Sequence, residues 1–592
     1  KIIQRFFYMS CNFLPMTKKE MTAKGWDHLD VIIITGDPYI DHHANGAAVI
    51  GRILESAGYR VGIIARPDWR QNDDFMKLGE PRLFFAVSSG GMDSMVCNYT
   101  ANKKPRKSLQ GQKPDRAVIA YTNKIKENFK NIPIIIGGIE ASMRRLAHYD
   151  YWDNKVRRSL LLDSKADILV YGMGDRQIVE IAKRLDSGEP VKNITNIRGT
   201  VVLANNCLTS DFYMLPSYEE IIHDKENFNK SFALFYNEQE PNSAKPLVQK
   251  YGNRFIIHNP PNFPLEPSEL DKIFELPYQN TWHPFYDRQG GIKNFESVKF
   301  SITASVGCPG ECSFCSISIH QGRIVQSRTL ESIYRQAKKL TQMPDFRGTI
   351  TDIGGATANL YLSKCEKWNS GIFCKNKNCL IPTKCKNLKL GYDECIDLYK
   401  KILDIPKVKH VFIGSGLRYD LLIDEESQEY LEQICRHHIS GRMKIAPEHT
   451  VEKVLKFMGK PSFDIYKKFV KRFNKVVAKM KKPIFLVNYF IVSHPGSDLN
   501  DALNLGLYCV NNKIHPEQIQ DFIPLPMSIA SCMYYTGFHP LTREKVYAPK
   551  DIEERNMQRA LVQYRNNGSK KFVIRALKRL GKFYLVRRFY KI

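Results

Sequence analysis

The chain has 592 residues, of which 43% are hydrophobic. This is enough apolar mass for two or three domains, because a single core stops growing at about 250 to 300 residues, and it excludes a disordered chain. The longest purely apolar runs, such as residues 31–34, are far shorter than the roughly 20 residues that cross a bilayer, so no membrane association is expected. The 88 basic and 61 acidic residues give a net charge of +27, compatible with nucleic acid or phosphorylated partners and equally with a general lysine-rich bias.

Residues 1–29 are expected to form an N-terminal arm. The stretch from Lys1 to Met16 has no small-residue cleavage site, so it is interpreted as a leading arm or an upstream extension before a start at Met9 or Met16. Without export, a cytoplasmic location is expected. The 14 cysteines are then better explained by metal or cluster binding than by disulfides.

Residues 30–192 alternate short apolar strands with helical stretches, which predicts a doubly wound parallel sheet covered by helices. A helix is predicted at residues 46–58. Strands are predicted at residues 30–35, 60–65, 83–87, 117–121, 132–136 and 168–171. The stretch 99–115 is rich in Lys, Pro and Gln and is expected to be an exposed, mobile loop. Residues 193–295 contain many Pro, Asn and aromatic residues and are predicted to be an irregular connecting region.

A second alternating series occupies residues 296–540. Its strands are predicted at residues 299–304, 349–353, 410–413, 443–445, 484–492 and 519–523. Six strand–helix units predict an open, partial parallel barrel of the (β/α)6 type, in which chemistry gathers at the carboxyl ends of the strands. The basic tail, residues 541–592, is predicted to form two helices separated by a break at residues 566–568, with an apolar stripe that packs on the barrel.

Three cysteines, Cys308, Cys312 and Cys315, come directly after the first strand of this second series. Such a loop can wrap a cuboidal iron–sulfur cluster, and three thiolates for four irons leave one iron open to a substrate or cofactor. A zinc site is the alternative. Zinc sites usually pair two CxxC-like knuckles, and no fourth ligand stands at that spacing here.

The triad, with Phe314 before its last cysteine, resembles the CxxxCxΦC motif of the radical S-adenosylmethionine (SAM) superfamily. The resemblance implies a [4Fe-4S] cluster whose open iron binds the amino and carboxylate groups of SAM. It implies reductive cleavage of SAM to methionine and a 5′-deoxyadenosyl radical, with Phe314 packed near adenine. It also implies an electron donor such as flavodoxin or ferredoxin.

Further cofactor-binding candidates follow later strands of the predicted barrel. Gly354 and Gly355 look like the superfamily's glycine pair, whose backbone holds the methionine part of SAM, although the usual Glu does not follow. Ser415 lies in a glycine-flanked turn after the third strand and could approach the ligand closely. Glu448 and His449, after the fourth strand, are candidates for contacting the ribose or for serving the substrate in catalysis.

A second set of cysteines, Cys365, Cys374, Cys379 and Cys385, has the spacing CX8CX4CX5C in a Lys- and Asn-rich loop. Four soft ligands suggest a metal, either a closed tetrahedral zinc or an auxiliary iron–sulfur cluster, and either would stabilise a loop with little apolar content. Chance clustering is the third alternative, and Cys395 could replace one member. The scattered remaining cysteines are expected to be small buried hydrophobes.

The first strand is followed by Asp41, His43 and Gly46, which match the DxHxxG motif of classical cobalamin-binding domains. Ser88-Ser89 and Gly137-Gly138 follow later strands, as they do in that fold. The glycines are equally expected of any doubly wound sheet with tight strand–helix turns. A cobalamin-binding-like fold is therefore expected more firmly than bound cobalamin itself, which stays open.

Several segments together resemble the YgiQ-type (UPF0313) family of radical SAM proteins. They are residues 35–42, 137–142, 148–152, the cysteine triad followed by residues 320–323, and residues 447–449. The family usually has Pro at the position of His43, which argues against cobalamin. The resemblance covers nearly the whole chain from Met16, implies a radical SAM enzyme and leaves the substrate open. The rival hypothesis is a non-catalytic metal-binding protein that docks RNA through its basic tail and cysteine quartet.

Overall fold

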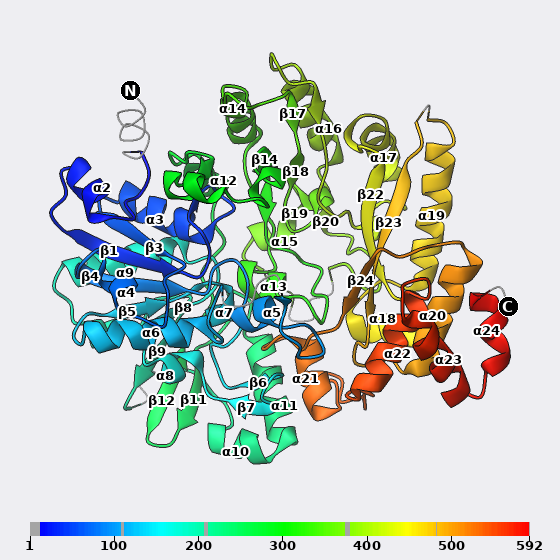
Figure 1. Cartoon of the computed structure of the whole chain (residues 1–592), viewed down its shortest axis with the longest axis horizontal. Helices are drawn as coiled ribbons and strands as arrows, with labels where there is room; N and C mark the ends of the chain where they lie inside the picture. The colour runs from blue at the N-terminus through cyan, green and yellow to red at the C-terminus, as the bar shows by residue number, and fades with distance from the viewer. Residues whose placement is uncertain are drawn as a thin grey trace. The chain divides into compact units, whose positions relative to one another are not determined.

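The computed structural model describes residues 12–107, 112–206, 211–372, 374, 379–480 and 482–590. The chain divides into two compact units. The first comprises the chain up to Lys299 together with Ile319–Gly322, and the second comprises Phe300–Ser318 and the chain from Arg323 onward. The elements of both units are labelled along the chain in Figure 1.

The first unit is built on one nine-stranded sheet. Its strands in spatial order are β10 (Tyr213–Met214), β11 (Leu247–Tyr251), β12 (Arg254–His258), β9 (Thr200–Ala204), β8 (Ile168–Val170), β5 (Ile134–Ile136), β4 (Pro81–Ser88), β1 (Leu29–Thr35) and β3 (Val61–Ala65). The five strands from β8 to β3 are mutually parallel, and the chain reverses its direction of winding between β1 and β4. This is the doubly wound arrangement that the sequence predicts.

Helices cover both faces of this sheet. Val31 and Ile33 of β1 share a core with α3 (Gly46–Ser56) and α9 (Asp175–Asp186), whereas Ile32 and Ile34 are buried on the opposite face. Burial on both faces explains why β1 is a continuous apolar run. The other helices of this unit are α2 (Lys18–Ala23), α4 (Asp73–Met76), α5 (Ser94–Asn98), α6 (Ala117–Asn128), α7 (Gly138–Ser142), α8 (Leu160–Ser164), α10 (Tyr218–His223), α11 (Lys225–Asn237) and α12 (Pro267–Phe274).

Three segments of this unit differ from the sequence-based expectations. Residues 117–121, predicted as a strand, begin helix α6, because their apolar run continues at helical spacing through Ile125. Residues 193–295 are more regular than predicted, since they supply β9 to β12, whose antiparallel pairing extends the sheet. In the stretch 99–115, Lys113 is buried, and its Nζ donates to the Ser89 carbonyl at 2.9 Å and pairs with Asp37 at 2.5 Å.

The second unit contains the six barrel strands that the sequence predicts. They are β14 (Ser301–Thr303), β17 with β18 (Thr349–Ile350 and Asp352–Gly354), β21 (His410–Val411), β22 (Arg442–Glu448), β23 (Phe485–Val492) and β24 (Gln518–Asp521). All pairings between neighbours are parallel and follow the order of the chain, with a single bridge from Leu417 to Ile445 joining the third position to the fourth. The result is an open, partial barrel whose carboxyl strand ends share one rim.

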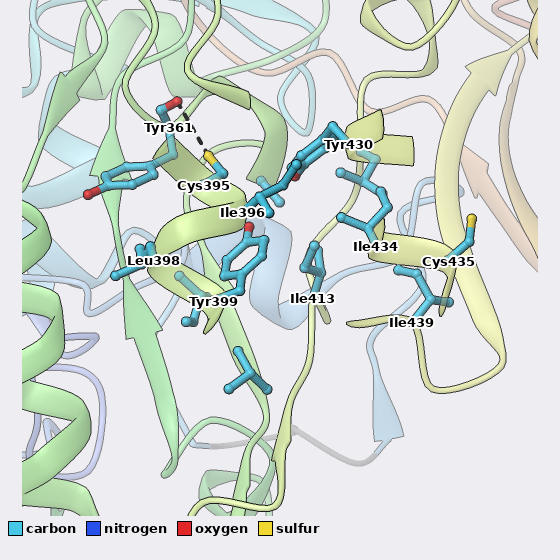
Figure 2. Close-up of a cluster of buried hydrophobic side chains, with 14 of the residues drawn as sticks. Tyr361, Cys395, Ile396, Leu398, Tyr399, Ile413, Tyr430, Ile434, Cys435 and Ile439 are labelled. Carbon is cyan, nitrogen blue, oxygen red and sulfur yellow. Dashed lines mark hydrogen bonds between the residues drawn. The ribbon is translucent and has the colours of Figure 1, made fainter. Parts of the chain in front are cut away.

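Helices pack around these strands. They include α14 (Leu330–Leu340), α16 (Tyr392–Leu403), α17 (Gln428–Gln433), α18 (Glu452–Met458), α19 (Phe463–Val477), α20 (Leu499–Asn511) and α21 (Ile529–Thr536). Figure 2 shows part of the core they enclose, in which Tyr399 and Ile413 lie among aliphatic side chains. Cys395 and Cys435 belong to this core, as expected of structural cysteines. Cys11 and Cys207 lie outside the described residues.

The C-terminal tail is helical and packed. Helices α22 (Ile552–Val562), α23 (Ser569–Arg579) and α24 (Val586–Phe589) share a small core with α20, to which Val573 and Leu577 contribute fully buried side chains. The predicted break at residues 566–568 separates α22 from α23. Within the described residues, no helix combines the length and the apolar character that a bilayer crossing demands.

Candidate active site

The cysteine triad lies in a loop between two short paired strands, β15 (Ser305–Val306) and β16 (Gln326–Ser327). All three thiols are free and only partly exposed. The Gly310 amide donates to Cys308 Sγ at 3.4 Å, and the Ile317 amide donates to Cys315 Sγ at 3.5 Å. Amide donors to sulfur stabilise thiolates and tune the clusters they hold, so this donor set fits an iron–sulfur cluster.

Two buried cations lie near these thiols. Burial raises the pKa of Cys308 and raises that of Cys315 to about 12, and the charges of Arg418 and Lys460 oppose this effect at Cys308. Arg418 comes so close to the loop that a Cβ on Gly310 would lie 2.5 Å from its Nη1. Arg418 also pairs with Asp420 at 2.7 Å. A cysteine thiol must lose its proton to bind iron. The positive charges of Arg418 and Lys460 favour this deprotonated, metal-binding form.

Ser313 and Phe314, inside the triad loop, are positioned by His494. His494 Nδ1 lies 2.7 Å from the Pro495 carbonyl, so it must carry the proton, and Nε2 accepts from the Ser313 hydroxyl at 3.1 Å. Burial lowers the pKa of His494 to about 3, which keeps this ring neutral. Its edge meets the Phe314 ring at 5.8 Å. Sequence reasoning missed His494, although its place directly after the fifth barrel strand was a usable signal.

The glycine pair stands where two strand ends approach each other closely. A Cβ on Gly355 would lie 2.6 Å from the Ser305 carbonyl, which precedes the triad loop, and a Cβ on Gly354 would overlap Ser415 Oγ. Gly354 itself pairs with Thr303 of β14. The absence of side chains therefore lets the second strand end pack directly beside the triad's own strand.

Ser415 is tied to Asp352 of β18. The Asp352 carboxylate accepts from the Gly414 amide at 2.8 Å, from the Ser415 amide at 3.1 Å and from the Ser415 hydroxyl. The hydroxyl proton is thus used within the protein, and only the oxygen lone pairs remain for a ligand. This carboxylate holds the turn after the third strand against the end of the second.

Glu448 and His449 end the fourth strand in an unusual backbone conformation. Glu448 has a φ of +66°, is almost fully buried and faces Lys460 at 3.8 Å. Burial raises the pKa of Glu448, and Lys460 counteracts this. His449 Nδ1 accepts from the Val451 amide at 3.2 Å, which places the proton on Nε2, a buried atom without a partner among the described residues. Strained backbone and an orphaned donor are features that cluster at functional sites.

Comparison with known proteins identifies the family of this chain. The radical SAM N-terminal family matches residues 13–301, the radical SAM superfamily matches residues 302–505, and a domain of unknown function, DUF3362, matches residues 517–587. A UPF0313 protein of Clostridium botulinum (strain Okra) is 48% identical over 561 residues, which are 93% of this chain and 87% of the relative. A UPF0313 protein of Clostridium perfringens (strain 13) is 46% identical over 579 residues, covering 96% and 88%. The chain belongs to the UPF0313 family.

As a UPF0313 member with a radical SAM domain, the chain is a radical SAM enzyme, and its class uses a [4Fe-4S] cluster, SAM and a reductant. The non-catalytic RNA-docking alternative is not favoured. Among solved structures, the radical SAM methyltransferase TsrM from Kitasatospora setae, with cobalamin and a [4Fe-4S] cluster bound, has a TM-score of 0.47 and 14% identity, covering 84% of this chain and 74% of TsrM. The cobalamin-dependent enzyme OxsB has a TM-score of 0.48 and 11% identity, covering 87% and 56%.

In this UPF0313 chain the DxHxxG residues are engaged with other parts of the first unit. The Asp41 carboxylate accepts from Arg52 at both oxygens and from the Gln279 amide at 3.1 Å. The His43 ring is buried, 4.0 Å from the His42 ring and 5.4 Å from the Phe274 ring. In this structure Asp41 is therefore held by an arginine, and the His43 ring lies among other rings.

The charged side chains at residues 140–150 also bind other residues of the first unit. The Glu140 carboxylate accepts from the amides of Ser94 and Val118 at 2.8 and 3.3 Å, which ties it to α5 and α6. Arg144 pairs with the buried Asp93. These contacts give the charged run a structural role.

The cysteine quartet of the UPF0313 chain gathers around one short hairpin. Strands β19 (Lys364–Cys365) and β20 (Leu388–Lys389) place Cys365 opposite Leu388. The Leu388 amide donates to the Cys385 carbonyl at 3.0 Å, and the Cys385 amide donates to the Cys379 carbonyl at 2.8 Å. Burial raises the pKa of Cys379 to about 12, and the charges of Glu311 and the other three thiols add to this.

Cys395, the substitute that the sequence allowed, lies elsewhere. Its Sγ donates to the Tyr361 carbonyl at 4.0 Å inside the barrel core, as Figure 2 shows. Cys395 thus belongs to the barrel core rather than to the hairpin of the quartet.

Proposed function

We propose that Cys308, Cys312 and Cys315 bind the [4Fe-4S] cluster of this radical SAM enzyme. The observation that carries the proposal is the triad loop itself: three free thiols directly after the first barrel strand, with amide donors at two of the sulfurs and Arg418 beside them. When bound, the cluster supplies the electron and the open iron for reductive cleavage of SAM to methionine and a 5′-deoxyadenosyl radical.

The residues around the loop would shape the SAM side of the site. The backbone of Gly354 and Gly355 would hold the methionine part beside the triad, and Asp352 holds the turn at Ser415 against this strand end. Phe314 would pack near adenine, in an orientation supported by His494. Glu448 would accept hydrogen bonds from the ribose hydroxyls, with Lys460 balancing its charge.

His449 is the candidate for serving the substrate. Because its Nδ1 accepts from the Val451 amide, its Nε2 can only donate, and burial lowers its pKa to about 3. A neutral donor of this kind would orient a polar group of the substrate without supplying charge. Cobalamin is not part of the proposal, because Asp41 and His43 are engaged within the protein.

The electron donor would be a small low-potential protein such as flavodoxin or ferredoxin, in the cytoplasm. Every cysteine among the described residues is a free thiol, which is typical of a reducing compartment. The basic tail is less suited to docking RNA than its charge suggests, because its apolar stripe is used for packing against α20.

The test is anaerobic. The full chain is reconstituted with iron and sulfide, reduced with dithionite in the presence of SAM, and assayed for 5′-deoxyadenosine by mass spectrometry. We expect 5′-deoxyadenosine from the wild type and a loss of at least about 100-fold in Cys312→Ala, while the core variant Cys435→Ala retains the activity. Equal 5′-deoxyadenosine from the wild type and Cys312→Ala would remove the triad from the mechanism.

A further inference from the structure

The cysteine quartet packs against the same small apolar cluster as the catalytic triad. The cluster has five buried members, Val325, Leu360, Leu380, Leu388 and Leu421. Cys308 of the triad and Cys379 and Cys385 of the quartet all pack on it. Two sets of thiols that are far apart in the sequence are thus neighbours within the second unit.

The quartet is held in place by backbone contacts rather than by a core of its own. Three of its members are linked through one hairpin, since Cys365 pairs with Leu388, Leu388 bonds to Cys385, and Cys385 bonds to Cys379. Among the described residues between Cys365 and Leu388, Leu380 is the buried aliphatic side chain. Small modules with so little core are commonly stabilised by a bound metal group.

The arrangement favours a cluster over a single ion. Within the described ranges, no three His, Cys, Asp or Glu side chains are grouped closely enough to hold a single metal ion. The quartet lacks the paired CxxC knuckles of structural zinc sites, and four thiolates are the usual complete ligand set of a [4Fe-4S] cluster.

We propose that Cys365, Cys374, Cys379 and Cys385 bind a second [4Fe-4S] cluster, next to the triad and fully ligated by protein. With all four irons held by thiolates, this cluster has no open position for SAM or substrate. Because Cys379 and Cys385 pack on the same apolar cluster as Cys308, the second cluster would support the triad loop and give the second unit two adjacent metal centres. The proposal goes beyond SAM cleavage and does not depend on it, because the quartet would bind iron whether or not SAM reacts.

Metal counting tests this proposal directly. Three forms of the full chain are reconstituted with ferrous iron and sulfide in the presence of equimolar zinc: the wild type, a triad variant (Cys308→Ala, Cys312→Ala, Cys315→Ala) and a quartet variant (Cys365→Ser, Cys374→Ser, Cys379→Ser, Cys385→Ser). We expect about eight irons and eight sulfides in the wild type and about half of each in both variants, with negligible zinc. The core variant Cys435→Ala is the matched control and should keep the full content.

Spectroscopy separates the two centres. In the triad variant, the reduced protein should still give a [4Fe-4S] electron paramagnetic resonance signal, and SAM should not change it. A triad variant that retains no iron, or retains about one zinc per chain in place of iron, would overturn the proposal. This measurement decides the question even if the quartet variant does not fold. Loss of SAM cleavage in the wild type would refute the proposed function alone and leave the iron count unaffected.

Discussion

At the scale of single residues, the carboxylate of Asp352 organises the rim of the barrel. It binds two amides and one hydroxyl of the turn that carries Ser415, and that turn leaves no room for a side chain on Gly354. The two strand ends are therefore joined by the hydrogen bonds of Asp352 and by close packing of the turn against Gly354. We expect substitutions of Asp352 or Gly354 to change SAM binding more than they change other properties of the protein.

Gly354→Ala should weaken SAM binding by about tenfold or more. The added methyl group must displace Ser415, and overpacking of this kind costs about 1 to 3 kcal/mol. Gly416→Ala is the matched control, because its Cβ would meet its nearest neighbour at 4.0 Å, an ordinary contact. Isothermal titration of SAM into the reconstituted proteins compares them. Equal dissociation constants for Gly354→Ala and the wild type would exclude the glycine pair from the SAM site.

The buried histidines predict how stability depends on pH. Burial lowers the pKa of His449 and of His494 to about 3, so each binds a proton in the unfolded chain below pH 6.5 but not in the folded chain. Stability should therefore fall as pH falls from 6.5, by up to about 1.4 kcal/mol per pH unit for each histidine.

Urea unfolding of the metal-free protein between pH 6 and pH 5, followed by fluorescence, measures this slope. His494→Gln should reduce the slope by roughly the contribution of one histidine relative to the wild type. His515→Gln is a control, since His515 lies on the exposed loop before β24. Parallel pH profiles for His494→Gln and the wild type would contradict the neutral, buried state of this ring.

Residues such as His494 mark the limit of sequence-based prediction at this scale. The triad was predictable because three thiols at that spacing have few other uses. For His494 the sequence shows only its place after the fifth strand. Its contact with Ser313 joins positions 181 apart and depends on the barrel bringing the two strand ends together. The DxHxxG match shows a related limit: the sequence does not show that Arg52 pairs with the Asp41 carboxylate.

At the scale of elements, the six barrel strands were predictable because each is an apolar run bounded by helical segments. The first unit was harder. Residues 117–121 are apolar like a strand, and only the continuation to Ile125 identifies helix α6. Strands β11 and β12 escaped prediction because the Pro- and Asn-rich segments around them dominate the local composition, whereas their antiparallel pairing is a long-range property.

The packing of helix α23 gives a prediction at this scale. Leu577 is fully buried against α20 and α22, so Leu577→Ala should destabilise the tail by about 2 to 5 kcal/mol. The neighbouring exposed Lys578→Ala should change stability by less than about 0.5 kcal/mol. Hydrogen exchange of α22 and α23 measures both. Equal protection in the two variants would mean that the tail does not depend on its apolar stripe.

At the scale of the whole molecule, the net charge of +27 favours acidic partners. Flavodoxin and ferredoxin are candidate donors, and attraction between opposite charges is screened by salt. Reduction by an acidic flavodoxin should slow several-fold when potassium chloride is raised from about 50 to about 500 mM. Reduction by dithionite, a small reagent, is the comparison. The same salt dependence with both reductants would argue against electrostatic docking of the donor.

The proposed chemistry depends on an open iron in the triad cluster, and the electron paramagnetic resonance spectrum of the reduced, reconstituted protein tests for it directly. The wild type is measured with and without SAM, next to the triad variant. Because three thiolates leave one iron free to bind SAM, the part of the signal that is missing from the triad variant should change its g values when SAM is added. A fully iron-loaded wild type whose spectrum is identical with and without SAM would contradict the account.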